Sequence, residues 1–319
     1  MELIRGLHNL RPAHRGCVAT IGNFDGVHLG HQAVIGQLTE RAQALGLPTT
    51  LVTFEPQPLE FFSPEKAPAR LTRLREKLQV LRRFAVDRVL CLRFDQQFAA
   101  LSPDAFIDRI LIQGLDVQHL VIGDDFRFGT DRRGDFASLQ AAGQRHGFQV
   151  VNMHAFDIDG ARVSSTRIRT ALATGDLAEA EKLLGRPYRM CGRVAHGDKI
   201  GRSIGVPTAN IHIHRRQTPL KGIFIVELFG LEGEPLPGVA SIGTRPTVDG
   251  TRTLLEVHLL DFEQEIYGAY VNVNFLLKLR DEKRFDSIED MRRQILLDIE
   301  HARDYFRRPL GPSRRTQKS

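Results

Sequence analysis

Two hydrophobic periodicities, one after the other along the chain, constrain the fold more than any other feature of the sequence. In the first half, short apolar runs typical of buried strands alternate with segments that carry apolar residues at helical spacing. The alternation predicts an α/β domain, in which helices cover a parallel sheet. The strand-like runs are Val18 to Ile21, Thr49 to Phe54, Arg88 to Leu92, Leu120 to Ile122 and Gln149 to Met153. The helical patterns are His31 to Leu45, Leu71 to Phe84 and Pro103 to Ile110.

In the second half the period becomes two, as in strands that bury one face. Between Val271 and Leu279, every second residue is apolar, and Ile223 to Phe229 forms another strand-like run. Glycine and proline turns separate these runs, which predicts a small antiparallel β-barrel. Ser287 caps a terminal helix. Its predicted core-facing residues are Ile288, Met291, Ile295, Ile299 and Ala302.

The chain has 319 residues, which exceeds the usual size of a single hydrophobic core and predicts two domains. Asp176 to Leu184 is a short helical pattern, Gly185 is a plausible C-cap, and an extended stretch starts at Arg186. We therefore expect one domain at 1–185 and a second at 186–308, followed by a basic, disordered tail at 309–319.

Composition excludes several classes of protein. No apolar segment has the length or flanks of a signal peptide or a membrane span, so we expect a cytoplasmic protein without a membrane partner. Three widely separated cysteines do not make a disulfide framework or a zinc motif. The net charge of +6 would allow nucleic-acid binding, but basic and acidic residues are interleaved along most of the chain. No nucleic-acid partner is therefore expected.

A pair of histidines follows the first strand-like run, in the segment Gly26 to His31. A helix that starts here would offer unpaired N–H groups and a partial positive charge to an anion, and His28 and His31 would share one face. Gly22, Gly26 and Gly30 would let the backbone approach the ligand closely. Taken alone, such a pair is more often two surface histidines on a helix.

A second polar motif, Ser164 to Arg169, combines three hydroxyl groups with two guanidinium groups ahead of a helical stretch. Hydroxyls at a helix start and the planar forks of arginine both bind phosphate oxygens. An ordinary N-cap followed by solvated charges is the alternative. Because two such segments bracket one α/β pattern, they predict a nucleotide held between them.

The chain resembles bifunctional riboflavin kinase/FAD synthetases. The His-x-Gly-His turn and Ser-Ser-Thr-Arg-Ile-Arg are similar to their adenylyltransferase half. Gly205 to Asn210 (Gly-Val-Pro-Thr-Ala-Asn), Gly243 to Thr247 (Gly-Thr-Arg-Pro-Thr) and Leu255 to His258 (Leu-Glu-Val-His) are similar to their kinase half. The motifs cover nearly the whole chain in the correct order. The resemblance implies a Rossmann-like nucleotidyltransferase domain with a parallel sheet, followed by a riboflavin kinase-like barrel with a terminal helix.

This resemblance implies two reactions that use ATP as co-substrate and require Mg²⁺. The barrel would phosphorylate riboflavin to FMN, and the first domain would adenylylate FMN to FAD with release of pyrophosphate. FMN's phosphate is already mostly ionised at neutral pH, so the second reaction chiefly needs positioning and stabilisation of charge. His28 and His31 are the expected catalytic residues of this half.

Other residues of the first half are carried over from the same motifs. The expected ATP- and phosphate-binding residues are Gly22, Phe24, Gly30, Ser164, Ser165, Thr166, Arg167 and Arg169. The loop after the fourth strand supplies the expected flavin-binding residues Asp124, Phe126 and Phe128. Either phenylalanine could instead anchor the loop in the core. The family often has His where this chain has Gln57.

In the barrel, Thr208 and Asn210 are two apart on an expected strand, so their oxygens would face the same way and could bind Mg²⁺. A merely polar strand face is the alternative. Riboflavin's hydroxyl is an alcohol and needs a base, for which Glu256 is the candidate, with a cross-strand ion pair as its alternative role. Ser241 stands where the family often has Asn. The expected ATP-binding residues are Gly192, Lys199, Gly201, Gly205 and Pro207.

Two other functions remain open from the sequence. The chain could be a nucleotidyltransferase that acts on another small phosphate and carries an inactive barrel. It could also be a flavin- or RNA-binding protein without catalytic activity. Both retain the same fold, because a fold does not determine the chemistry of its site.

Overall fold

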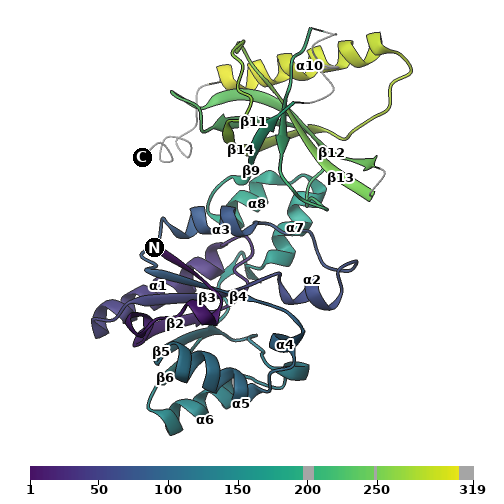
Figure 1. Cartoon of the computed structure of the whole chain (residues 1–319). Helices are drawn as coiled ribbons and strands as arrows, with labels where there is room; N and C mark the ends of the chain where they lie inside the picture. The colour runs from purple at the N-terminus through teal and green to yellow at the C-terminus, as the bar shows by residue number, and fades with distance from the viewer. Residues whose placement is uncertain (197–204, 248–249, 309–319) are drawn as a thin grey trace. The chain divides into compact units, whose positions relative to one another are not determined.

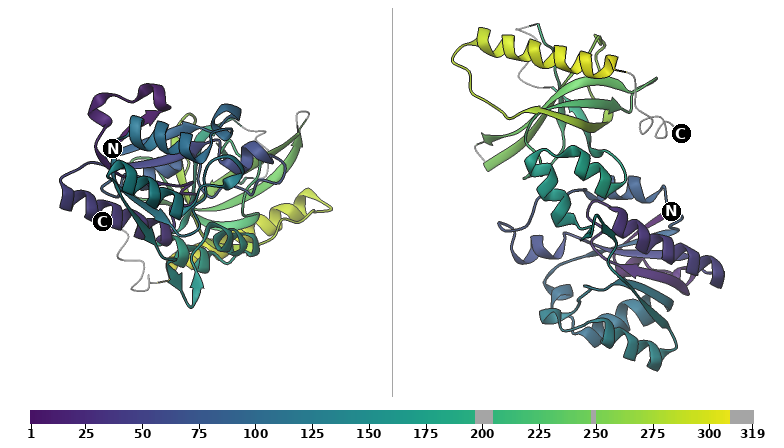
Figure 2. Two further views of the ribbon diagram at one scale, coloured as in Figure 1. Left: turned by 90° about the horizontal axis from the view of Figure 1, so that it is seen from below. Right: turned by 180° about the vertical axis from the view of Figure 1, so that it is seen from behind.

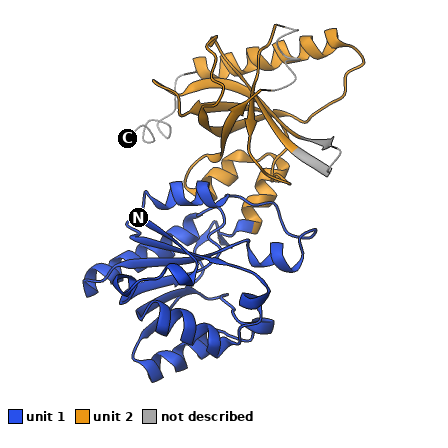
Figure 3. Ribbon diagram, viewed as in Figure 1, with its two compact units in different colours: residues 1–165 blue, residues 166–319 orange. Residues whose placement is uncertain are grey.

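The structure is a computed structural model that describes residues 1–196, 205–247 and 250–308 (Figure 1). Lys199 and Gly201, two of the expected ATP-binding residues, and the expected tail at 309–319 lie outside the described residues. The chain divides into two compact units, residues 1–165 and 166–319 (Figure 3). The domain boundary after residue 185 stays a prediction.

The first unit contains one six-stranded sheet in which every pair of neighbouring strands is parallel. The predicted parallel α/β domain is therefore confirmed. The strands, in spatial order, are β1 (Glu2–Arg5), β4 (Arg88–Arg93), β3 (Thr49–Glu55), β2 (Cys17–Ile21), β5 (Val117–Gly123) and β6 (Gln149–Met153). The pattern of the sequence did not predict β1, a short edge strand.

Helices cover both faces of this sheet (Figure 2). On one face, Leu51 and Val89 form a core with residues of α1 (Leu29–Leu45) and α3 (Leu74–Leu81). On the other face, Val52 packs with α5 (Pro103–Phe106), the π-helix η3 (Ile107–Gly114) and α6 (Phe136–His146). Neighbouring residues of each strand thus enter opposite cores, which explains why the strands read as continuous apolar runs.

Shorter elements complete the first unit. They are η1 (Leu7–Asn9), η2 (Pro12–His14), α2 (Pro58–Phe62), α4 (Gln96–Ala99), η4 (Thr130–Arg132), β7 (Asp157–Ile158) and β8 (Ala161–Arg162). Helix α7 (Ser165–Thr174) begins at the end of this unit, and α8 (Leu177–Leu184) follows it. As the sequence predicts, Gly185 ends α8 in the left-handed conformation, with φ of 70°.

Six antiparallel strands of the second unit close into a barrel, as predicted. Alternate residues such as Leu255 and Val257 are buried, which matches the period of two. The strands, in spatial order, are β10 (Ala209–His212), β13 (Gly250–Leu259), β12 (Leu236–Thr247), β11 (Gly222–Phe229), β14 (Tyr270–Arg280) and β9 (Tyr188–Ala195).

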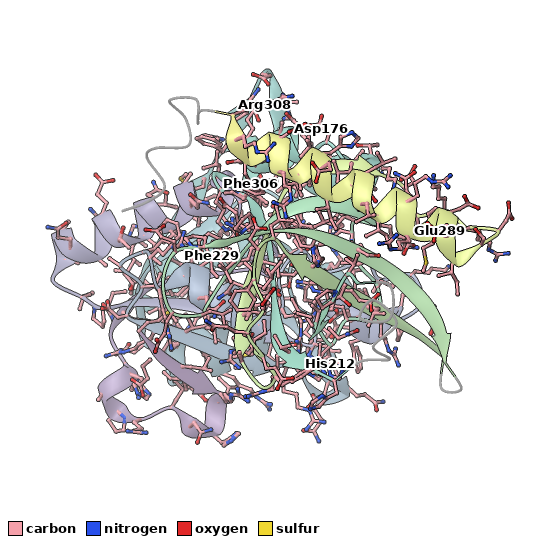
Figure 4. The ribbon with its side chains drawn as sticks, turned by 90° about the horizontal axis from the view of Figure 1, so that it is seen from above. Asp176, His212, Phe229, Glu289, Phe306 and Arg308 are labelled. Carbon is pink, nitrogen blue, oxygen red and sulfur yellow. The ribbon has the colours of Figure 1, made fainter. Side chains whose placement is uncertain are left out.

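The terminal helix α10 (Ile288–Arg307) lies across the barrel, with Glu289 and Phe306 near its two ends (Figure 4). Ile299 and Ala302 pack with buried barrel residues, and Ile295 and Phe306 lie at the edge of this core. The predicted stripe is wrong at Ile288, which is 69% exposed. Ile288 is the first residue of the helix, about two turns before Ile295, where this packed surface begins.

A buried ion pair joins α10 to the barrel. Asp298 is 2% exposed, and its carboxylate accepts hydrogen bonds from Nε and Nη2 of Arg280 at 3.1 and 2.7 Å. Gln294 donates a further hydrogen bond at 3.1 Å. Removing one charge of such a pair leaves the other without compensation, which costs more than the pair contributes.

We expect Asp298→Asn to lower the free energy of unfolding of the second unit by about 2–3 kcal/mol, less than for a fully buried pair because Arg280 remains partly solvated. The chain has four tyrosines and no tryptophan, and all four tyrosines lie between Tyr188 and Tyr305. Tyrosine fluorescence during urea denaturation therefore reports this unit alone. Asp304→Asn, which removes an exposed ion pair on the same helix, is the control, with an expected change below about 0.5 kcal/mol. Equal effects of the two changes would contradict the prediction.

Within residues 1–196, 205–247 and 250–308, no helix combines the length and the apolar character needed to cross a membrane.

Candidate functional site

The histidine turn starts α1 and stacks two imidazole rings. His28 is the N-cap, and its Nδ1 accepts a hydrogen bond from the backbone N–H of His31 at 3.3 Å. The two rings are nearly parallel, with centroids 3.6 Å apart, and Phe24 lies against His31 at 5.1 Å. Because Nδ1 of His28 accepts, its Nε2 carries the proton and is a donor. The turn thus presents a helix N-terminus together with an imidazole donor.

His31 is held in its neutral form. Burial of the ring lowers its pKa well below the ordinary 6.5, and the charges of His28, when it is protonated, and of Lys77 and Arg162 lower the pKa further. Nδ1 of His31 is buried and has no hydrogen-bond partner among the described residues. A neutral imidazole can donate one hydrogen bond to a phosphate, and a bound anion would offset the charges that oppose its protonation.

Gly30 gives this turn its close packing. A Cβ atom at Gly30 would lie 3.3 Å from the ring of His28 and 3.4 Å from the carbonyl oxygen of Val163. The first distance is shorter than most Cβ contacts, and the second is at the short limit of ordinary van der Waals contact. At Gly22 a Cβ atom would lie 3.2 Å from the ring of Phe24. These two expected phosphate-binding glycines therefore keep side chains out of the turn.

Two buried charged residues that sequence reasoning missed fix the backbone between β2 and α1. The carboxylate of Asp25 accepts hydrogen bonds from the N–H groups of Leu71 and Thr72 at 3.1 and 2.9 Å. Lys77, on α3, is 1% exposed and donates to the carbonyl oxygen of Asn23 and to Oγ1 of Thr53. Burial lowers the pKa of Lys77, while the charge of Asp25 opposes that shift. Both side chains position the histidine turn.

The hydroxyl motif meets this turn at Ser165. Its Oγ donates to the carbonyl oxygen of Asp25 at 2.9 Å. Helix α7 begins at Ser165, so Thr166, Arg167 and Arg169 lie within the helix and not ahead of it. Arg167 pairs with Glu179 of α8 at 2.5 Å. The hydroxyl of Ser165 thus joins the turn, and the guanidinium of Arg167 is held by a carboxylate.

The expected flavin loop follows β5 and is anchored by aromatic packing. Phe128 is buried, contacts Phe106 with a centroid distance of 4.9 Å, and exchanges backbone hydrogen bonds with Gly134. Phe126 is half-buried and stacks on Phe128 at 5.6 Å. Phe128 therefore has the core role that the sequence left open, and Phe126 is the ring that keeps exposed area.

Arg162 connects this loop to the hairpin β7–β8. Its Nη2 lies 3.1 Å from Asp124 and 3.1 Å from Asp125. The same guanidinium contributes to the lowered pKa of His31. Asp124 and His31 therefore lie near one shared cation, which sequence reasoning did not identify.

An arginine also organises the segment after β3. Arg70 donates to both carboxylate oxygens of Glu55, at 2.9 and 2.7 Å, and pairs with Glu60 of α2. Burial alone would raise the pKa of Glu60, but hydrogen bonds from Arg70 and from the N–H of Gln57 hold it below the ordinary value. Gln57, the departure from the family pattern, is buried, and its Nε2 has no partner among the described residues.

In the barrel, the side chains of Glu256, Asn210 and Ser241 share one face. Glu256 of β13 pairs in register with Asn210 of β10 on one side and with Ser241 of β12 on the other. Residues directly opposite in antiparallel strands point to the same face. Leu255 and Val257 are fully buried on the opposite face, as expected. Glu256 is half-buried and Asn210 is 8% exposed, so this polar row is partly screened from water.

The segment before β10 is fixed by a backbone contact. The carbonyl oxygen of Pro207 lies 2.8 Å from Nδ1 of His258, and Gly205 has φ of 80°, which favours glycine. Thr208 directly precedes β10 and is not within it, so the expected strand pair of Thr208 and Asn210 is wrong in this detail. Pro207 has no N–H for a strand ladder, and its carbonyl bonds to a side chain.

At two positions of the barrel, close neighbouring atoms leave no room for a side chain and require glycine. Gly192 lies on β9 next to the paired strand β10, and a Cβ atom there would collide with the carbonyl oxygen of His212. Gly243 lies beneath the carboxylate of Glu282, which a Cβ atom would displace. Gly243 is two residues from Ser241 on the same strand face. Glu282 is therefore a second carboxylate at this polar row, and no motif in the sequence indicated it.

Comparison with known proteins assigns the two halves. A family model described as FAD synthetase matches residues 10–167, and one described as riboflavin kinase matches residues 184–306. The bifunctional riboflavin kinase/FMN adenylyltransferase of Escherichia coli (strain K12) is 53% identical over 307 residues, covering 96% of this chain and 98% of its own length. The protein of that description from Pseudomonas fluorescens is 55% identical over 304 residues, covering 95% and 97%.

A solved structure has the same fold. The crystal structure of a Streptococcus pneumoniae protein, described as a macrolide-efflux protein, has a TM-score of 0.79 at 30% identity and covers 95% of this chain and 99% of its own. The full-length relatives, the two matched segments and the fold agree. The chain belongs to the family of bifunctional riboflavin kinase/FMN adenylyltransferases.

Proposed function

We propose that this chain makes FAD from riboflavin in two ATP-dependent steps. The barrel phosphorylates riboflavin to FMN, and the first unit transfers an adenylyl group to FMN and releases pyrophosphate. The family and the coverage of both halves support the two activities. The observation that carries the proposal is that one chain holds both a helix N-terminus with two stacked imidazoles and a strand row in which Asn210 and Ser241 flank Glu256.

In the kinase step, Glu256 is the proposed base. Riboflavin's primary hydroxyl must lose a proton as it attacks the γ-phosphate of ATP, and a half-buried carboxylate can accept that proton. The register of β10, β13 and β12 supports this role, because it puts Asn210 and Ser241 on either side of Glu256. Hydrogen bonding by these neighbours would orient the carboxylate toward the hydroxyl.

Mg²⁺ fits the oxygen donors of Asn210 in the same row and of Thr208 just before β10. Among the described residues, no three His, Cys, Asp or Glu side chains converge on a metal site. Mg²⁺ needs no such cage, because it retains waters and binds substrate phosphates with only one or two protein ligands. The hydroxyl of Thr208 and the amide oxygen of Asn210 would hold the ion. It would neutralise charge on the ATP phosphates.

In the adenylylation step, the residues of the histidine turn stabilise charge and need no general base. FMN's phosphate attacks the α-phosphorus of ATP, and the bond to the β-phosphate oxygen breaks. The N-terminus of α1 and the imidazoles of His28 and His31 are the proposed donors to the phosphates. The pKa of His31 supports a neutral donor before ATP binds.

The titration of His31 provides a direct check. In the free protein, NMR should give His31 a pKa below 6.5, because burial and neighbouring charges disfavour the cation. Saturation with ATP should raise that pKa by about 1–3, the effect expected of an opposite charge at close range. The His31→Gln variant assigns the resonance. An unchanged pKa on ATP binding would place the phosphates elsewhere.

The complete reaction tests the function. Purified protein is incubated with riboflavin, ATP and Mg²⁺, and the flavins are separated by chromatography over time. FMN followed by FAD supports both steps. Formation of FMN alone would contradict the proposed role of the histidine turn. Formation of no product would favour a nucleotidyltransferase that acts on another phosphate, or a non-catalytic binding protein. A cytoplasmic location and the lack of a nucleic-acid partner stay predictions of the sequence.

A further inference from the structure

A shallow pocket of about 380 Å³, open to solvent over much of its surface, lies in the first unit, away from the histidine turn. It adjoins the amino ends of β2 and β5, where the N–H of Gly16 donates to the carbonyl oxygen of Leu115 at 2.9 Å. The histidine turn follows the opposite, carboxyl end of β2. The lining residues are Leu7, Leu10, Arg11, Pro12, Arg15, Arg109, Gln113 and Gly114.

The charged side chains that line this pocket are all positive. Arg11, Arg15 and Arg109 line it, and no carboxylate does. All three arginines are exposed, and none forms an ion pair within the described parts of the chain. Elsewhere in this unit, Arg70 and Arg162 each bind two carboxylates. Three unpaired guanidinium groups around one concave surface repel one another, and an anion would relieve that repulsion.

Apolar side chains form part of the remaining wall. Leu7 and Leu10 pack against the main core of the sheet, and Arg109 and Gln113 lie on the π-helix η3. A Cβ atom at Gly114 would lie 2.9 Å from the carbonyl oxygen of Arg109 and 3.1 Å from Leu10, so glycine lets Leu10 pack closely against η3. Helices of the π type are rare and are often found at functional sites.

We propose that this cavity, the arginine pocket, binds a small molecule that carries a diphosphate and a ring. Planar guanidinium groups form paired hydrogen bonds with phosphate oxygens. Three of them can balance the negative charge of a diphosphate, which is larger than that of a single carboxylate. The volume lies within the range of small-molecule sites. Leu7, Leu10 and Pro12 provide apolar contact for a ring. The pocket shares no residue with either proposed catalytic site and requires neither activity.

A tryptophan reporter makes the binding visible. The chain has no tryptophan, so Gln113→Trp places a single tryptophan at the pocket, which can be excited selectively above the absorption of the tyrosines. ADP without Mg²⁺ is the probe, with adenosine as the uncharged comparison. We expect a saturable fluorescence change with ADP and none with adenosine. Arg109→Gln in this background should weaken ADP binding about tenfold, because it removes a charged hydrogen-bond donor.

Matched variants exclude a general effect of charge. Arg83→Gln removes an exposed arginine after α3 and should leave the ADP response unchanged, as should His31→Ala at the catalytic turn. A response without saturation, or one that Arg109→Gln and Arg83→Gln reduce equally, would overturn the proposal. If the tryptophan itself blocks the pocket, calorimetry on the otherwise unchanged protein decides. Equal ADP affinities at every site of the natural protein and of Arg109→Gln would also overturn it.

Discussion

Glu256→Gln is expected to slow the formation of FMN from riboflavin by about 10²–10⁴-fold and to leave the formation of FAD from supplied FMN unchanged. The amide has nearly the same shape but cannot accept the proton of the ribityl hydroxyl. Initial rates of the two half-reactions, measured separately by chromatography of the flavins, test this. The effect should fall on kcat, because the carboxylate acts on a proton that moves only during the reaction.

Two other glutamates sharpen this test. Glu263→Gln, in the exposed loop before β14, is the matched control and should leave both rates unchanged. Glu282 is the other carboxylate at the polar row, beside Gly243. A large loss with Glu282→Gln and a small loss with Glu256→Gln would transfer the role of base to Glu282. A loss of FAD formation with Glu256→Gln, in protein whose tyrosine fluorescence shows an intact barrel, would contradict the separation of the two steps.

Periodicity predicted most of the fold because burial decides it locally. The strands β2 to β5 read as apolar runs since both of their faces are covered. The helix-start signals of Ser102 and Ser287 were confirmed, because each caps an N–H three residues on. The edge strand β1 was not predicted, since its four residues are too few to display a period.

The candidate sites were predictable only where a motif is contiguous. The histidine turn and Glu256 stand in short motifs, and the structure confirms their backbone setting. Lys77 was missed because a lysine in an amphipathic helix is usually solvated, and its partners Asn23 and Thr53 come from other segments. Arg70 and Arg162 were missed for the same reason. Each has meaning only through carboxylates brought together by the fold.

Thr208 illustrates a different limit. Spacing alone predicted that Thr208 and Asn210 share a strand face, but β10 begins only at Ala209. The bond between the carbonyl of Pro207 and His258 fixes the preceding backbone, and it joins residues 51 apart in the sequence. Such a contact has no periodic signature. The exact direction of a ligand at the end of a strand therefore depends on tertiary packing.

His31→Ala is expected to lower the rate of FAD formation from FMN by about 10²–10³-fold, the usual effect of removing one preorganised donor to developing charge. FMN formation from riboflavin should remain unchanged. The stack on His28 and the contact with Phe24 show that the ring is held in one position before substrate binds.

The choice of replacement separates charge stabilisation from packing. His31→Gln restores a hydrogen-bond donor and should recover part of the lost rate, whereas His31→Phe restores only the ring and should not. His146→Ala, at the end of α6, is the matched control and should retain full activity. If His31→Phe matched the natural protein, the ring would serve packing alone. The helix N-terminus and His28 would then be the remaining donors to the phosphates of ATP.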